Sequence, residues 1–179
     1  MTDYELTRRD ALKALGAAGV TVAGGAAALT WSDSDDDSDD RPLGESERET
    51  LHAVAKTVYP SELDGIGAFV DAFIAGRLDA EPERADGIAD AVAALDAYTS
   101  EWEDAPFREV EADRREETLT GMGVDTAEPD PDGYPRERVR YYIVNELLFA
   151  LYSSPTGGEL VGLENPQGHP GGTESYRHS

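Results

Sequence analysis

Residues 82–102 read PERADGIADAVAALDAYTSEW and predict the fold more clearly than any other stretch of the chain. Their large apolar side chains recur every three to four residues, which is the period of one face of an α-helix. These positions are Ile88, Val92, Leu95, Tyr98 and Trp102. Pro82 favours a helix start, because the first turn of a helix has no use for the missing N–H. The stretch therefore predicts a helix with one buried face.

Similar apolar stripes lie on both sides of this helix. The first stripe ends before Pro60, which disfavours helical geometry in the preceding residue, and Ser46 with Glu49 offers a capping box at its start. The expected helices are residues 45–59, 69–78, 82–102, 106–119 and 135–151. No segment has the alternating pattern of a strand. The sequence thus predicts an all-α fold, with about five helices in one small domain over residues 43–153.

The first thirty residues have the pattern of a twin-arginine export signal. An arginine pair precedes a charge-free, Ala/Gly-rich run over residues 14–29, which ends in small residues of the kind a signal peptidase accepts. The motif residues are Arg8, Arg9, Leu12 and Lys13. The run is shorter than the roughly 20 apolar residues of a spanning helix. We therefore expect residues 1–30 to direct export to the outer face of the membrane or beyond. A retained anchor, a short membrane helix and a chance basic pair are the alternatives.

Acidic residues dominate the charge of the chain. Its 179 residues carry a formal net charge of −23, and only two of the basic residues are lysines, Lys13 and Lys56. Such a surface fits a halophilic protein, in which high salt screens the repulsion between carboxylates; an acidic disordered chain is the alternative. The Ser/Asp run within residues 31–42 predicts an extended linker and lacks the spacing of a calcium loop. Nucleic acid is a poor partner, because its phosphates would be repelled.

The sequence shows no pattern typical of catalysis. It has no cysteine, which excludes disulfides, thiolate nucleophiles and cysteine-ligated metals. It also has no nucleophile elbow, dinucleotide loop or phosphate loop. His52 lies on the first predicted helix of the domain, and His169 and His178 lie near the end without the spacing of a metal site. We therefore expect no catalytic, cofactor-binding or metal-binding residues; a secreted enzyme with an unrecognised site is an alternative.

Residues 154–179 form a Gly/Pro-rich tail without helical or strand periodicity. We expect an extended segment that binds a partner, since long loops without secondary structure are uncommon unless they are functional. A flexible terminus without a binding role is the alternative. Apolar anchors on an otherwise acidic body are typical of interface hot spots, whereas ordinary core packing would also explain them. The predicted partner-binding residues are Phe149, Tyr152, Pro155, Gly157, Gly158, Leu160, Leu163, Pro166 and Pro170.

The layout of the chain resembles the gluconate 2-dehydrogenase subunit 3 family. In that family a twin-arginine signal precedes a helix with a Tyr/Ile-Pro ending, and the last helix runs into a Ser/Asp-Pro-x-x-Gly-Gly turn and a Gly/Pro-rich close. Here residues 51–60, 148–158 and 160–172 match these three elements. The middle helices match in type and spacing. The close departs from the family pattern at residues 163–166, which read Leu-Glu-Asn-Pro.

The resemblance implies a non-catalytic small subunit. Members of the family bind a large flavin-dependent subunit of the glucose-methanol-choline type and carry it, already folded, through the twin-arginine translocase. FAD in that partner would supply the redox chemistry, and a cytochrome or other acceptor would take the electrons. The alternative function is a stand-alone acidic helical binding module that is secreted or tethered to the cell surface.

Overall fold

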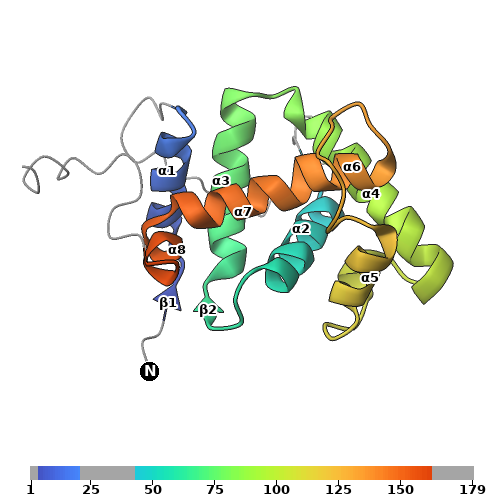
Figure 1. The fold of residues 1–179 in the computed structure, drawn as a ribbon. Coiled ribbons are helices and arrows are strands. Elements are labelled where there is room, and N and C mark those ends of the chain that lie inside the picture. Colours follow the sequence, from blue (N-terminus) through green and yellow to red (C-terminus); the bar gives the residue numbers. More distant parts are fainter. Residues whose placement is uncertain (1–3, 21–42, 163–179) are drawn as a thin grey trace, which may run out of the picture.

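The computed structural model describes residues 4–20 and 43–162, which are mostly helical (Figure 1). The all-α prediction is therefore confirmed for the described residues, to which one pair of two-residue strands is added. In chain order the elements are β1 (Tyr4–Glu5), α1 (Arg8–Ala17), α2 (Glu45–Val58), β2 (Leu63–Asp64), α3 (Ile66–Ala80), α4 (Arg84–Glu103), the 3₁₀ turn η1 (Phe107–Glu109), α5 (Arg115–Met122), α6 (Pro135–Val139), the π-helical turn η2 (Arg140–Val144), α7 (Asn145–Ser153) and α8 (Pro155–Leu160).

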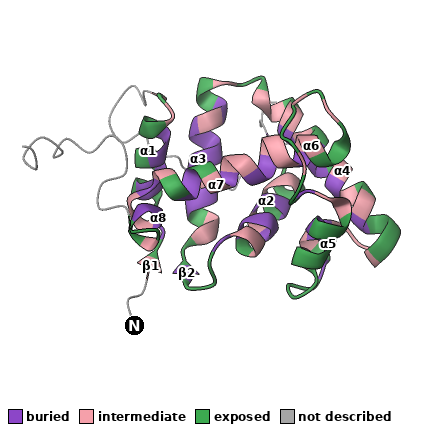
Figure 2. Cartoon of the chain, in the orientation of Figure 1, coloured by how far each residue is buried: buried purple, intermediate pink, exposed green. Residues whose placement is uncertain are grey.

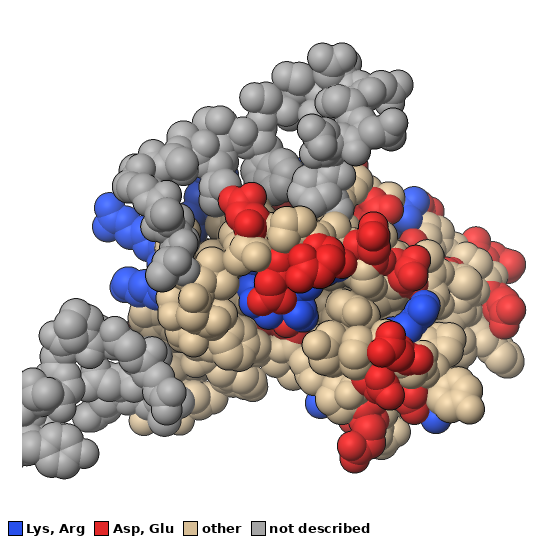
Figure 3. Space-filling view, turned by 90° about the horizontal axis from the view of Figure 1, so that it is seen from above, with Lys and Arg blue, Asp and Glu red and all other residues tan. Residues whose placement is uncertain are grey.

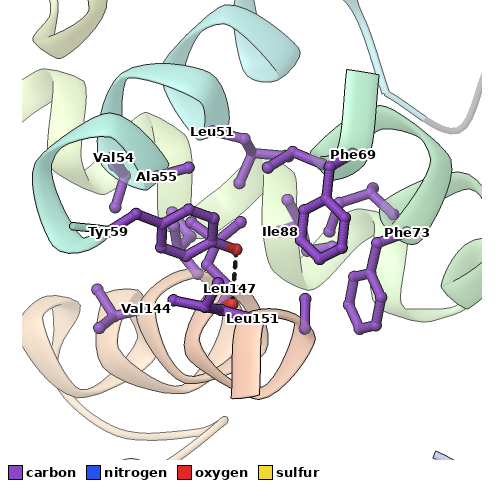
Figure 4. Packing of buried hydrophobic residues seen from close by; sticks show 14 of the residues in the cluster. Leu51, Val54, Ala55, Tyr59, Phe69, Phe73, Ile88, Val144, Leu147 and Leu151 are labelled. Carbon is purple, nitrogen blue, oxygen red and sulfur yellow. Dashed lines mark hydrogen bonds between the residues drawn. The ribbon is translucent and has the colours of Figure 1, made fainter. Parts of the chain in front are cut away.

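The core lies where the continuous helix formed by η2 and α7 crosses α3 and packs against α2 (Figure 1). Tyr59 follows α2 and lies between these helices, with its ring 6.5 Å from that of Phe69 (Figure 4). Its hydroxyl donates a hydrogen bond of 2.6 Å to the carbonyl oxygen of Leu147. Phe73 and Leu151 extend the same buried cluster. The inner sides of α1, α2, α3 and α7 are buried, whereas α5 and the end of α4 are largely exposed (Figure 2).

The helix ends follow from local chemistry. Tyr59 has extended geometry, with φ −90° and ψ 152°, as expected for a residue before proline, and α2 ends there. Gly44 rather than Ser46 occupies the N-cap of α2, and the Ser46 hydroxyl instead donates to the Glu47 carboxylate at 3.0 Å. Asp104 adopts the left-handed conformation, with φ 55°, at the end of α4. The first and third predicted helices of the domain thus have nearly the expected bounds.

The fourth predicted helix, residues 106–119, is wrong. The chain forms the single turn η1, leaves helical geometry, and enters α5 only at Arg115. Side chains compete with helical hydrogen bonding here: the Asp96 carboxylate accepts from the Phe107 N–H at 2.9 Å, and the Arg115 guanidinium donates to the Val110 and Arg108 carbonyls at 2.9 and 3.0 Å. Phe107 is fully buried, so packing holds this turn in place.

The predicted start of the folded part, near residue 43, is also wrong. Residues 4–17 form β1 and α1, which pack on β2, α3, α7 and α8. Their buried side chains, among them Leu6 and Leu15, belong to the same core as α3. In the described residues, no helix is both long enough and apolar enough to cross a membrane.

The tail was predicted to be extended from residue 154, and its first part is instead helical. Residues 155–160 form α8, because Ser154 caps the helix and Pro155 occupies its first turn. The remainder of the tail, from residue 163, lies outside the described residues, as do the linker residues 31–42.

Candidate partner-binding surface

The sequence Ser154-Pro155-Thr156-Gly157-Gly158 builds a tight corner between α7 and α8. The Ser154 hydroxyl donates to the Leu151 carbonyl at 2.6 Å and accepts from the Gly157 N–H at 3.0 Å. A Cβ atom at Gly157 would overlap the Leu151 carbonyl oxygen, so only glycine allows this close approach. Gly157 and Gly158 are both buried. Their role is therefore to shape the corner, and a partner would contact the side chains that the corner presents.

Three apolar side chains are exposed beside this corner. Phe149 and Tyr152 on α7 are 40% and 47% exposed, and Val161 directly after α8 is 52% exposed. Pro155 and Leu160 are half-buried. We call Phe149, Tyr152 and Val161 the α7–α8 surface. Sequence reasoning identified the first two and missed Val161, although its apolar neighbour Leu160 was a signal for it.

The remaining predicted partner-binding residues, Leu163, Pro166 and Pro170, lie outside the described residues. The Phe149 ring also contacts the core, with its centroid 6.4 Å from that of Phe73 on α3. This contact packs one side of the ring against α3, while 40% of Phe149 stays exposed. An aromatic side chain that already packs on its own protein loses less conformational freedom when it binds a partner.

The four predicted export-signal residues lie on one helix with its other face buried. Thr7 caps α1, accepting from the Asp10 N–H at 3.3 Å, while the Asp10 carboxylate accepts from the Thr7 N–H at 2.9 Å. The arginine pair thus occupies the first turn of α1. Arg8, Arg9, Leu12 and Lys13 are all exposed. The same capping residue that precedes the arginines therefore starts the helix that presents them.

Between α1, α3, α4 and α7 lies an open groove with an ion-pair network on its wall. Glu146 of α7 accepts from the Arg77 guanidinium at 3.0 and 3.2 Å and also pairs with Arg84. Glu81 closes the ring, at 2.8 Å from Arg77 and 3.1 Å from Arg84. The charges of this ring cancel, so it joins three helices without creating a charged binding site.

The irregular part of the last long helix borders the groove through Tyr141. Tyr141 and Tyr142 lie on η2, with their rings edge-to-face at 4.8 Å, and the Arg84 guanidinium lies within 6 Å of both ring centroids. Phe149 and Ala18 line the same groove. Sequence spacing gives the Arg77–Glu81 pair, but Glu146 comes from a helix far along the chain, so its part in the network could not be predicted.

Surface charge elsewhere is predominantly acidic. Figure 3 shows carboxylates over much of one face, with basic side chains beside them at the centre and at one edge. His52 is half-buried and lies 2.8 Å from the Asp71 carboxylate, which Arg48 also contacts at 3.1 Å. Within residues 4–20 and 43–162, no three His, Asp or Glu side chains are arranged to hold a metal ion. His169 and His178 lie outside these ranges.

Comparison with known proteins gives a match over the helical domain. A family model described as Gluconate 2-dehydrogenase subunit 3 matches residues 45–171. No curated protein and no solved structure matches the chain. The matched range contains α2 to α8 and so includes the whole α7–α8 surface, whereas α1 lies before it.

Proposed function

The chain belongs to the gluconate 2-dehydrogenase subunit 3 family, and from this premise we propose that it is the non-catalytic small subunit that escorts a flavin-dependent sugar or alcohol dehydrogenase through the twin-arginine translocase. The family is that of an accessory subunit of a dehydrogenase complex. The match over residues 45–171 is the observation that carries the proposal. In this proposal FAD belongs to the large subunit, which is of the glucose-methanol-choline type, and a cytochrome or similar acceptor receives its electrons.

The α7–α8 surface supports a partner of this kind. Phe149, Tyr152 and Val161 are large apolar side chains at 40–52% exposure on a chain with a net charge of −23. Exposed apolar side chains on so acidic a body gain by burial against another apolar surface. High salt strengthens such contacts while it screens charge repulsion between two acidic subunits. We therefore place the large subunit on the α7–α8 surface.

The exposed arginine pair supports the route. Arg8 and Arg9 occupy the first turn of α1 with their side chains exposed, in the motif Thr-Arg-Arg-Asp-Ala-Leu-Lys. A large subunit bound to this chain would cross the membrane on a signal that it does not itself carry. The complex would then act outside the cell or on the outer face of its membrane.

Co-purification tests the partner. The tagged full chain is isolated from its host in high salt, and the eluate is examined by mass spectrometry and flavin absorbance. We expect a stoichiometric flavoprotein, which Phe149→Ala combined with Tyr152→Ala should remove. Trp102→Ala is the matched control, because Trp102 is a more exposed aromatic residue, at 71%, on α4. A colourless chain that elutes alone would contradict the proposal and favour a stand-alone binding module.

An export assay tests the escort. Arg8→Lys combined with Arg9→Lys preserves both positive charges but removes the guanidinium groups. We expect both this chain and the flavoprotein to stay inside the cell. Export of the flavoprotein in spite of the double substitution would show that another signal carries it.

A further inference from the structure

The helix α1, which carries the arginine pair, has one exposed face and one buried face. Arg8, Arg9, Leu12 and Lys13 are exposed, and Leu12 is 42% exposed. The other face is fully buried at Ala11, Ala14 and Leu15, in contact with the core formed by α3 and α7. Gly19, in the left-handed conformation with φ 77°, ends the helix. Within α1, one face of the expected export signal is thus exposed, and the other is part of the core.

Residues outside the signal are shaped to receive it. The strand β1 pairs in parallel with β2, and the Leu6 N–H donates to the Asp64 carbonyl at 2.9 Å. Gly65 has φ 74°, and a Cβ atom there would overlap the Leu6 carbonyl oxygen. On α3, a Cβ atom at Gly76 would overlap the Leu15 side chain. Two glycines of the domain therefore leave the space that β1 and α1 occupy, which we call the α1 seat.

We propose that the α1 seat is a latch for the export signal, which holds the apolar face of α1 in the folded domain until the translocase or another binding event releases it. This inference rests on the proposed export function. A receptor that recognises the arginine pair together with the following apolar run must bury side chains that the seat already buries. Ala14 and Leu15 can be buried in only one of the two places. Only molecules with α1 out of its seat can bind the receptor in this way. The smaller their fraction, the weaker the apparent affinity of the signal for its receptor.

The two lysines of the chain provide an internal test of docking. Lys13 lies on α1 and Lys56 on α2, so cleavage by a lysine-specific protease at Lys13 reports release of the latch, and cleavage at Lys56 reports opening of the domain. Cleavage within a helix requires local unfolding. We expect Lys13 in the native full chain to be cut about a hundredfold more slowly than in urea. Cleavage at the unfolded rate would overturn the proposal.

Substitution of Gly76 loosens the seat without altering the signal itself. Gly76→Leu fills the space of the Leu15 side chain, and we expect cleavage at Lys13 to accelerate about tenfold while cleavage at Lys56 stays unchanged. If Gly76→Leu also accelerates cleavage at Lys56, the smaller Gly76→Ala takes its place. Gly67→Ala is the matched control on α3, because a Cβ atom there makes only ordinary contacts of 3.6 Å or more, with His52.

Export of the same full-length variants tests the function of the latch. We expect the Gly76 variant that releases Lys13 to leave the cell several-fold faster than wild type, and Gly67→Ala to leave at the wild-type rate. An unchanged export rate in a variant with Lys13 released would overturn the latch. If the chain is exported despite Arg8→Lys and Arg9→Lys, the proposed route and the latch both fail, whereas the protease comparison still reports whether α1 is docked.

Discussion

In the core, Tyr59 combines apolar packing of its ring with one hydrogen bond from its hydroxyl. Tyr59 is almost completely buried, and burial raises the pKa of its phenol far above the ordinary value. The hydroxyl therefore stays protonated and donates to the Leu147 carbonyl at 2.6 Å. This bond links the end of α2 to the first turn of α7, two elements that are far apart in the sequence.

Tyr59→Phe should remove this bond and leave the packing of the ring intact. We expect the free energy of unfolding to fall by about 1 kcal/mol, the usual net value of a buried hydrogen bond. Denaturant unfolding monitored by circular dichroism would measure it. Tyr152→Phe is the control, since that ring is half exposed, and it should change stability by less than about 0.5 kcal/mol. Equal effects of the two substitutions would contradict the role of the Tyr59 hydroxyl.

Asp71 should make the free energy of unfolding depend on pH in the acidic range. Partial burial raises the pKa of Asp71, but its hydrogen bonds with His52 and Arg48 and their positive charge outweigh burial, so the net pKa lies below the ordinary value. The pKa of Asp71 in the unfolded chain is the ordinary value of about 3.9. At pH values between the folded-state pKa of Asp71 and about 3.9, the unfolded chain binds more protons than the folded chain. The carboxylate therefore stabilises the fold above that window, and the stabilisation is lost as the pH falls through it.

Both Asp71→Asn and Asp96→Asn remove one negative charge. Comparing the two variants therefore separates the effect of the Asp71 pKa from that of the net charge of the chain. Asp71→Asn should reduce the loss of unfolding free energy between about pH 6 and about pH 3. Asp96→Asn should increase that loss, because burial raises the pKa of Asp96 more than the Phe107 N–H and Arg108 lower it, so protonation of Asp96 favours the fold. Denaturant unfolding at both pH values would measure the two slopes. The same sign for both variants would contradict the assignment.

Elements were predictable where local chemistry alone determines them. Pro60 ends α2 and Pro135 opens α6 as the sequence indicated. The predictions failed where a residue elsewhere in the chain determines the backbone conformation. Asp96 holds the turn at Phe107, and α1 packs on the helical core. The α7–α8 corner is an intermediate case, since Ser154 and Pro155 are typical of a helix start, whereas the composition of the following residues predicts an extended tail.

Gly157→Ala should damage the corner between α7 and α8. Its Cβ atom would overlap the Leu151 carbonyl oxygen, and the backbone would have to move to relieve the overlap. We expect a loss of about 1–3 kcal/mol in unfolding free energy and weaker co-purification of the large subunit. Thr156→Ala, next to it on α8, should stay within about 0.5 kcal/mol of wild type. Wild-type stability of Gly157→Ala would show that the corner tolerates a side chain.

The whole molecule carries a net charge of −23, and repulsion between its carboxylates opposes folding. Raising KCl from about 0.2 M to about 2 M should raise the melting temperature by several degrees, because the Debye length falls below the usual spacing of surface charges. Thermal unfolding followed by circular dichroism would measure it. Glu116→Gln with Glu117→Gln on the exposed side of α5 should weaken the salt dependence. A melting temperature that falls with salt would show that ion pairs outweigh repulsion.

The amino-acid sequence by itself determined the helical class, the net acidic charge, the arginine-pair motif and the resemblance to the family, because periodicity, net charge and short motifs are local properties of the chain. Only the tertiary structure decided which side of each helix is buried and against what. It placed Glu146 between Arg77 and Arg84, and it seated α1 beside Gly76. These contacts join residues far apart in the chain, and no local pattern specifies which pairs will meet when the helices pack.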